Sequence, residues 1–216
     1  MNKGLFITFE GTEGSGKTTQ LRLLATVLKE YRIPHVVTRE PGGSSLSTQL
    51  RYWILNKLEY KLMPRTELLL FLADRAQHVG EVIEPALKQG KVVLCDRYSD
   101  STLAYQGGGR GFEMKLLKRL NQTASELKPD LTLLFDLPAE VGLRRALGRG
   151  KGKDRMESEG LGFHRAVRRV YLETARKEKG RFIVVNANQS REFAYQEMLE
   201  GLIDRLPLRK KGGRRG

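Results

Sequence analysis

The sequence predicts an α/β fold in which helices cover both faces of one parallel β-sheet. Short apolar segments alternate along the chain with longer segments of helical spacing, as in βαβ units. The chain has 216 residues, which is enough for one domain with a packed core. Its hydrophobic content of 39% is typical of a globular protein.

Five segments are predicted as buried strands because they are short, apolar and rich in residues that favour strands. The first is Leu5-Phe6-Ile7-Thr8-Phe9, which runs into a glycine-rich turn. The other four span residues 35–38, 92–95, 131–136 and 182–186.

Helices are expected between these strands. From Thr18 to about Tyr31, leucine and alanine recur at helical spacing. Three further segments are long enough to form helices, at residues 67–79, 81–89 and 113–127. Glycine, lysine and arginine interrupt the helical pattern over residues 148–162, which predicts a mobile surface loop.

The composition excludes several classes of protein. Cys95 is the only cysteine, so disulfide frameworks and multi-cysteine zinc sites are excluded. No segment approaches the roughly 18 apolar residues of a membrane span. The first residues lack the features of a secretory signal. We therefore expect a cytoplasmic protein without a membrane partner.

The net charge of +14 raises the question of a nucleic-acid partner. Residues 144–181 hold 13 Lys and Arg against 5 acids, and residues 209–215 hold five more basic residues without an acid. We expect residues 1–207 to form a single domain and the basic tail, 208–216, to be disordered. Weak nucleic-acid contact and simple solvation are both open interpretations of this tail.

A glycine-rich loop follows the first predicted strand and precedes the first predicted helix. Gly11 to Thr18 matches G-x-x-x-x-G-K-[ST], the phosphate loop of P-loop NTPases. A chance glycine-rich turn is the alternative, and a Rossmann fingerprint is excluded because Lys17 and Thr18 stand where its third glycine belongs. The residues predicted to bind the phosphates of ATP are Gly11, Thr12, Glu13, Gly14, Ser15, Gly16, Lys17, Thr18 and Thr19.

Charged residues follow two other predicted strands, and strand ends line the ligand crevice of a parallel sheet. Asp96 is expected to hold Mg²⁺ together with Thr18, partly through water, or to orient the phosphates. Arg97 and Arg39 are expected to bind a phosphorylated acceptor. A structural ion pair between Asp96 and Arg97 is the alternative. No convincing base-recognition motif of a GTPase is present, which favours a small kinase.

Four strings resemble thymidylate kinases in order and spacing: Phe9-Glu10-Gly11, Arg39-Glu40-Pro41-Gly42-Gly43, Asp96-Arg97-Tyr98 and the segment Ala104 to Gly111. The resemblance runs from about Leu5 to about Leu206. It implies the bacterial type of this family, a homodimer that transfers the γ-phosphoryl group of ATP to dTMP, with Mg²⁺, for dTTP biosynthesis.

The resemblance also implies roles in binding dTMP. Phe71 would stack on the thymine ring, Arg75 would bond a base carbonyl and Tyr105 would crowd the 2′ position of the sugar. Core packing is the alternative role for Phe71, because its neighbours are apolar. The other residues assigned to dTMP are Glu13 near the 3′-hydroxyl, Arg39 and Arg97 at the 5′-phosphate, Thr102 at the N3 edge of the base, and Gln106.

Phosphoryl transfer requires a cation beside the transferred group. The variable positions of the phosphate loop hold no basic residue, so the cation is expected from the segment 148–162. Asp154-Arg155-Met156-Glu157 resembles the family's lid motif, which makes Arg155 the first candidate for this cation and Arg149 the second. The other residues expected to be catalytic are Lys17, Arg97 and Asp96. A solvated basic loop is the alternative. Replacing Arg155 by alanine is expected to lower kcat about 100-fold with little change in dTMP affinity.

Two competing functions remain open. One is a kinase for another nucleoside monophosphate or a small alcohol. The other is a P-loop ATPase that binds nucleic acid through the basic tail. Residues 186–189 are expected to contact adenine. We interpret the +14 charge as suited to a small polyphosphate substrate, and we expect no dedicated nucleic-acid partner.

Overall fold

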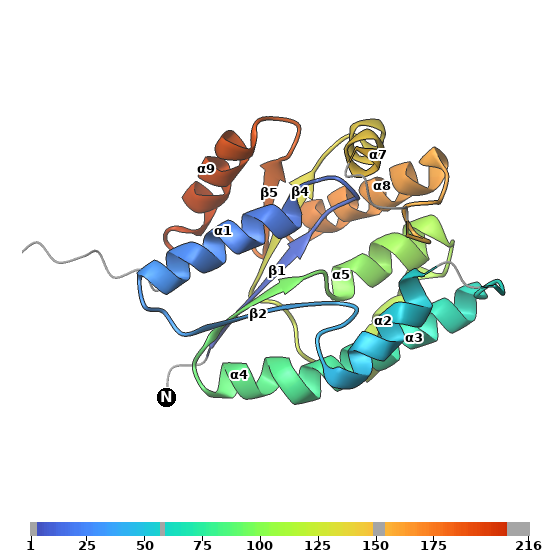
Figure 1. The fold of residues 1–216 in the computed structure, drawn as a ribbon, viewed down its shortest axis with the longest axis horizontal. Helices are drawn as coiled ribbons and strands as arrows, with labels where there is room; N and C mark the ends of the chain where they lie inside the picture. The colour runs from blue at the N-terminus through green and yellow to red at the C-terminus, as the bar shows by residue number, and fades with distance from the viewer. Residues whose placement is uncertain (1–3, 57–58, 149–153, 207–216) are drawn as a thin grey trace, which may run out of the picture.

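The computed structural model describes residues 4–56, 59–148 and 154–206. At its centre is a five-stranded sheet in the order β2-β3-β1-β4-β5, with every adjacent pair parallel (Figure 1). The five strands are β1 (Leu5–Glu10), β2 (His35–Arg39), β3 (Val92–Asp96), β4 (Leu131–Asp136) and β5 (Phe182–Asn186).

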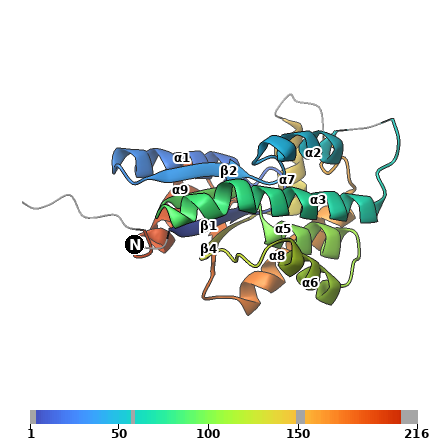
Figure 2. The ribbon, with the colours of Figure 1, turned by 90° about the horizontal axis from the view of Figure 1, so that it is seen from below.

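Helices cover both faces of the sheet, as Figures 1 and 2 show. None of them, over the described ranges, combines the length and apolar character that a membrane span requires. The α-helices are α1 (Lys17–Glu30), α2 (Ser45–Leu55), α3 (Pro64–His78), α4 (Glu84–Lys88), α5 (Ser99–Thr102), α6 (Met114–Ala124), α7 (Ala139–Leu147), α8 (Leu161–Lys177) and α9 (Arg191–Leu202). Two segments are π-helical, η1 (Val79–Ile83) and η2 (Leu103–Gly109).

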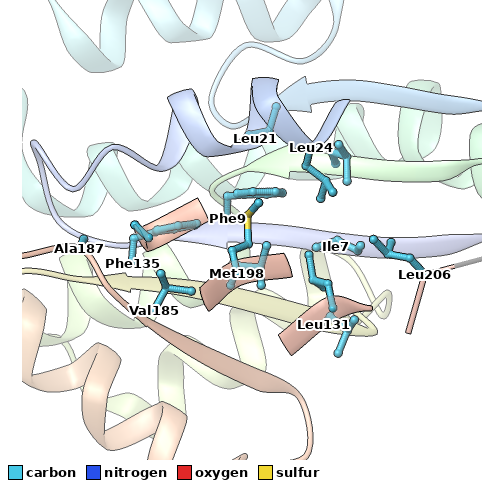
Figure 3. Close-up of a cluster of buried hydrophobic side chains, with 14 of the residues drawn as sticks. Ile7, Phe9, Leu21, Leu24, Leu131, Phe135, Val185, Ala187, Met198 and Leu206 are labelled. Atoms are coloured by element: carbon cyan, nitrogen blue, oxygen red, sulfur yellow. The ribbon is translucent and has the colours of Figure 1, made fainter. Parts of the chain in front are cut away.

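Side chains alternate across the sheet and build a separate core on each face. On one face, Ile7 and Phe9 of β1 pack with Leu24 of α1 and Met198 of α9 (Figure 3). On the opposite face, Phe6 packs against the rod formed by α3, η1 and α4. Both cores leave the carboxyl ends of the strands at one edge, where the connecting loops gather.

The five predicted strands are confirmed to within one residue at each end. The predicted separation of helices 67–79 and 81–89 is wrong, because α3, η1 and α4 follow one another without a break. A Cβ atom added at Gly80 would meet no other atom within 4 Å, so close packing does not require glycine here. Gly80 does not interrupt the rod. The wider π-turn lies just before Pro85, whose ring would crowd the preceding turn of a regular α-helix.

The predicted surface loop, 148–162, is only partly described. Residues 154–160 form turns, and α8 begins at Leu161, slightly before the predicted end of the loop. Residues 149–153, with Arg149, lie outside the described residues, and so do Pro207 and the basic tail.

Candidate active site

A cavity of about 250 Å³ lies at the carboxyl ends of β1, β2 and β3. It is lined by the start of α1, the loops after β2 and β3, helices α2 and α3, the π-helix η2 and the turn after residue 153. Every residue that the sequence assigned to dTMP lines this one cavity: Glu13, Arg39, Phe71, Arg75, Arg97, Thr102, Tyr105 and Gln106.

The phosphate loop connects β1 to α1 and lies at the cavity's edge. Gly14 has a φ of 71°, and a Cβ atom there would stand 2.1 Å from the carbonyl oxygen of Gly142 in α7. Only glycine allows this close approach. The loop ends at Gly16, the N-cap of α1, so the free amides of that helix start at the loop. A helix N-terminus in this position favours a phosphate group.

Lys17 and Thr18, at the end of the loop, line the cavity. Burial and the nearby Arg97 lower the pKa of Lys17, whereas Glu13 and Asp96 oppose that shift. The Thr18 hydroxyl donates a hydrogen bond to the Asp96 carboxylate. These two oxygen-bearing side chains therefore meet at the mouth of the cavity, at the ends of α1 and β3.

The meeting of Thr18 and Asp96 fits a magnesium ion, which prefers oxygen ligands and keeps several waters or substrate phosphates. Among the described residues, no group of three His, Cys, Asp or Glu side chains is placed to hold a metal. The protein would thus supply one hydroxyl and one carboxylate, and the remaining ligands would be phosphate oxygens and water.

Arg97 is fixed by an ion pair and an aromatic ring. Its Nη2 lies 2.8 Å from Glu13 Oε1, and its guanidinium lies 4.8 Å from the centre of the Tyr105 ring. The Tyr105 hydroxyl donates to the same Glu13 oxygen at 2.6 Å. Burial would raise the pKa of Glu13, but the charges of Arg97 and Lys17 and this hydrogen bond lower it to about 2. Glu13 is therefore an anion at neutral pH.

The backbone of Arg97 has a φ of 72°, an uncommon conformation for a residue with a side chain. Buried Glu10 stabilises this turn by accepting hydrogen bonds from the Tyr98 amide at 2.7 Å and from the Ser101 hydroxyl at 2.6 Å. Burial and neighbouring Asp100 raise the pKa of Glu10 to about 7. Glu10 thus shapes the turn that aims Arg97 at the phosphate loop.

Arg75 is 1% exposed, and several groups hold its guanidinium. Glu40 accepts from Nε at 2.9 Å and lies 2.8 Å from Nη2. Nη1 donates to Thr102 Oγ1 at 2.9 Å and to Asn121 Oδ1 at 2.7 Å. Because Arg75 and Thr102 bond each other at the cavity wall, their polar edges are fixed before any ligand arrives.

Arg51 also lines the cavity, and sequence reasoning missed it. It comes from α2 and donates from Nη1 to the Pro41 carbonyl at 2.7 Å. Burial and the charge of Arg39 lower the pKa of Arg51. The signal for α2 is present in the sequence, because Ser44 caps the helix by accepting from the Ser47 amide. Besides Arg75, which Glu40 holds, three arginines therefore line this cavity: Arg39, Arg51 and Arg97.

Phe71 is half-buried and lies at the cavity wall, outside the hydrophobic clusters of the core. Its neighbours on α3 point elsewhere, because Leu68 and Leu72 are in the core and Leu69 is 60% exposed. This placement favours a ligand-facing ring over the alternative of core packing.

Arg155 is not among the residues that line the cavity. Its Nη1 lies 2.5 Å from Glu67 Oε2, and its Nε donates to the Ile54 carbonyl at 2.8 Å. The structure therefore does not bring Arg155 together with Lys17 and Arg97. Its neighbours Asp154, Met156 and Glu157 do line the cavity.

A second hollow lies on the other side of the phosphate loop. Gly14 and Gly16 form one wall, and Ala187 and Gln189, from the segment predicted to contact adenine, form another. Arg145 of α7 lines this hollow and donates to the Ala187 carbonyl at 2.8 Å. The two hollows thus meet at the loop, with the phosphate-binding groups between them.

The sequence profile of the family described as Thymidylate kinase matches residues 9–198. The chain belongs to the thymidylate kinase family. A thymidylate kinase of Carboxydothermus hydrogenoformans is 53% identical over 204 residues, covering 93% of this chain and 98% of the relative. A thymidylate kinase of Pelobacter propionicus is 53% identical over 191 residues, covering 86% and 87% of the two chains.

A solved structure has the same fold. The thymidylate kinase from Ehrlichia chaffeensis superposes with a TM-score of 0.74 and 34% sequence identity, covering 93% of this chain and 99% of that one. The phosphate loop and the central cavity lie at the same edge of the sheet in this member of the family. The arrangement of the thymidylate kinase family is therefore present here in both sequence and structure.

Proposed function

We propose that this member of the thymidylate kinase family transfers the γ-phosphoryl group of ATP to dTMP and forms dTDP, a precursor of dTTP. The observation that carries the proposal is the composition of the central cavity. Its lining combines an aromatic ring, polar groups that are fixed by hydrogen bonds, several guanidinium groups and residues of the phosphate loop. A nucleoside monophosphate carries groups that match this lining: a flat base, a sugar and a dianionic phosphate.

The base and sugar roles follow from the contacts of the wall. Phe71 stacks on thymine, and the Arg75–Thr102 pair bonds the polar edge of the base, with Gln106 beside it. Tyr105 donates a 2.6 Å hydrogen bond to Glu13, and the Arg97 guanidinium lies over its ring, so both groups hold the ring in place. We propose that this fixed ring disfavours a 2′-hydroxyl, and that the Glu13 carboxylate accepts from the 3′-hydroxyl.

The phosphate roles follow from charge. Arg39, Arg51 and Arg97 bind the 5′-phosphate of dTMP, and Lys17 with the amides of residues 11–19 binds the phosphates of ATP. These groups hold donor and acceptor in line and offset the negative charge of the transition state. Arg149, which lies outside the described residues, remains a predicted source of an additional cation. The resemblance implies the same role for Arg155, which lies against Glu67 in the structure.

Thr18 and Asp96 are the residues that would hold Mg²⁺. The ion, when bound, neutralises phosphate charge and orients the phosphate oxygens. We also propose a cytoplasmic location, because ATP and nucleoside monophosphates are cytoplasmic metabolites.

A coupled assay with ATP, Mg²⁺ and a panel of monophosphates tests the proposed function. We expect dTMP to give the highest kcat/KM, followed by dUMP, with dCMP and the ribonucleotide UMP far lower. A higher value for dCMP or UMP would show that the roles of Arg75, Thr102 and Tyr105 are wrong. ATP hydrolysis that DNA stimulates, with no transfer to any monophosphate, would contradict the proposal as a whole.

We propose further that the protein is a homodimer. On α2 and α3, the large apolar side chains of Tyr52, Trp53 and Leu69 are each more than 40% exposed. Such exposed apolar groups on neighbouring helices are typical of a protein interface. Sedimentation equilibrium is expected to give a mass near 49 kDa, twice the 24.5 kDa of the chain. Leu69→Glu should shift it to the monomer mass, and a wild-type monomer would rule the dimer out.

A further inference from the structure

Glu67, in the first turn of α3, is a fully buried carboxylate that sequence reasoning did not single out. Donors from two other parts of the chain surround it. Gln106 Nε2 of η2 donates at 2.8 Å, and Arg110 donates from Nε at 3.2 Å and from Nη2 at 3.0 Å. Arg155 Nη1 completes the group at 2.5 Å. Burial would raise the pKa of Glu67, but these donors and their charges lower it.

The segment Asp154-Arg155-Met156-Glu157 is a capped turn. The Glu157 amide donates to Asp154 Oδ1 at 2.8 Å, and the Asp154 amide donates to Glu157 Oε2 at 3.3 Å. This reciprocal pairing is the arrangement of a capping box. The two end residues therefore fix the shape of the turn, and the two middle residues are free to attach it to the rest of the protein.

Arg155 and Met156 attach the turn to helices α2 and α3. The Arg155 amide donates to the Leu55 carbonyl at 2.9 Å, and its Nε donates to the Ile54 carbonyl at 2.8 Å. Met156 is buried in the hydrophobic cluster that contains Leu68 and Leu72 of α3. The remaining Arg155 nitrogen, Nη2, is also buried and has no hydrogen-bond partner, so protein atoms enclose the guanidinium.

The same turn forms part of the central cavity through Asp154, Met156 and Glu157. We propose that Glu67 and Arg155 form an anchor that holds the turn 154–157 as a wall of the dTMP cavity. Both are then positioning residues for dTMP, and Arg155 does not supply positive charge to the transferred phosphoryl group. The inference rests on the proposed dTMP kinase activity and differs from the catalytic role that the sequence resemblance implies for Arg155.

The anchor also reaches the cavity by a second route. Glu67 orients the Gln106 amide, which lines the cavity, and Arg110 connects Glu67 to Glu159 through a 2.6 Å ion pair on the far side of the turn. One buried carboxylate therefore positions both Gln106 and the turn 154–157, which line the same cavity.

Arg155→Ala separates the two roles of Arg155. We expect the dissociation constant for dTMP, measured by calorimetry, to rise about tenfold, with ATP affinity unchanged and kcat at saturating dTMP lowered less than fivefold. Arg155→Lys retains a charge for Glu67 and should recover part of the dTMP affinity. A fall in kcat of about 100-fold with unchanged dTMP affinity would overturn the anchor and support a catalytic cation. Unchanged affinity and rate would overturn it as well.

A double-mutant cycle tests whether Arg155 acts through Glu67. Glu67→Gln should weaken dTMP binding as Arg155→Ala does. The dissociation constant of the double variant for dTMP should not exceed that of whichever single variant has the higher value. If the fold-changes of the two single variants in the dissociation constant for dTMP multiply in the double variant, the anchor is contradicted. Arg165→Ala, which removes an exposed ion pair with Glu140, is the matched control and should leave dTMP affinity unchanged.

Hydrogen exchange gives a readout that does not depend on the reaction. In Glu67→Gln, the Arg155 amide should exchange at least tenfold faster than in the wild type, because its bond to Leu55 loses support. Unchanged protection would overturn the anchor even in an active enzyme. If the wild type neither binds nor phosphorylates dTMP, the proposed function is contradicted. The exchange measurement would still test the contact between Glu67 and the turn, because it needs no substrate.

Discussion

At the scale of single residues, the central cavity is organised by buried carboxylates that hold arginines. Glu13 holds Arg97, Glu40 holds Arg75, and Glu67 holds Arg110 and Arg155. The first two pairs fix the arginines that line the cavity, Arg97 and Arg75, which would otherwise lose rotamer freedom when a ligand binds. The entropy of ordering these arginines is therefore lost on folding and not on substrate binding, which favours affinity.

Asp74 is the buried carboxylate of α3 that lacks such a pairing in the described structure. Its Oδ1 accepts from the Gly42 amide at 3.0 Å, and its Oδ2 has no hydrogen-bond partner. Burial and the nearby charge of Glu40 raise its pKa from 3.8 to about 6. Asp74 is therefore ionised at neutral pH at a cost to the folded state.

This shift predicts a pH-dependent effect of Asp74→Asn. Between pH 4 and 6 the unfolded chain releases this proton while the folded protein retains it, so ionisation destabilises the fold as the pH rises. At pH 7 the variant should be more stable than the wild type by about 1 to 3 kcal/mol in urea unfolding. At pH 4 the difference should vanish. A destabilised variant at pH 7 would contradict the prediction, and exposed Asp204→Asn is the control with no expected effect.

The sequence predicted individual site residues where a motif named them and missed those that depend on tertiary contacts. The eight residues assigned to dTMP all line one cavity because their motifs follow strands or lie one helical turn apart on α3. Arg51 reaches the same cavity only because α2 folds back over the loop after β2. Glu67 was missed because nothing in the local sequence indicates that donors from residues 106, 110 and 155 converge on it.

At the scale of elements, strands were predicted more accurately than helices. A buried parallel strand is a short continuous apolar segment, and all five stand out between polar neighbours. The rod α3-η1-α4 could not be predicted, because glycine and proline usually end a helix, and the π-turn that accommodates Pro85 leaves no mark in the sequence. Packing against the sheet, through Val79 and Ile83, stabilises the continuous rod.

The contact between α7 and the phosphate loop is another feature of this scale. A Cβ atom on Gly142 would stand 2.3 Å from the Glu13 carbonyl oxygen, so the helix and the loop touch through bare backbone. This contact holds the loop against α7, whose Arg145 also lines the second hollow beside the loop.

Gly142→Ala should therefore weaken ATP binding. The added methyl group must push the loop and α7 apart, and we expect the dissociation constant for ATP to rise about tenfold or more in a titration. Gly162→Ala, in the first turn of α8 where the methyl group meets nothing, should leave ATP affinity unchanged. Equal ATP affinity in both variants would show that the loop does not depend on α7.

At the scale of the whole molecule, much of the positive charge is already paired with acids. From the basic region 144–181, Arg155, Arg165, Arg168 and Arg181 pair with Glu67, Glu140, Asp136 and Asp100. The interpretation of the +14 charge as suited to a small polyphosphate substrate therefore needs modification, because several arginines of this region connect helices and strands. The Arg168–Asp136 pair, for example, joins α8 to the end of β4.

Removal of residues 208–216 tests the tail on this scale. The deletion lowers the net charge from +14 to +9 and removes no residue assigned to substrate. We expect kcat to remain within about a factor of two of the wild-type value. The melting temperature should remain within about 2 °C of that of the wild type. A large loss of kcat at unchanged dTMP affinity would instead give the tail a part in the reaction.

The π-helical turn η2 has a consequence for how this family can change. A π-turn holds one more residue than an α-turn, so it is equivalent to a single-residue insertion in a helix. Deleting one residue between Leu103 and Gly109 would restore an α-turn and rotate everything after it by about 100°. If the deleted residue is Ala104 or one of the glycines, Arg110 would turn away from Glu67 although every side chain of the site is still encoded. The length of this turn is therefore constrained as strongly as the identity of its residues, three of which are glycines without room for a side chain.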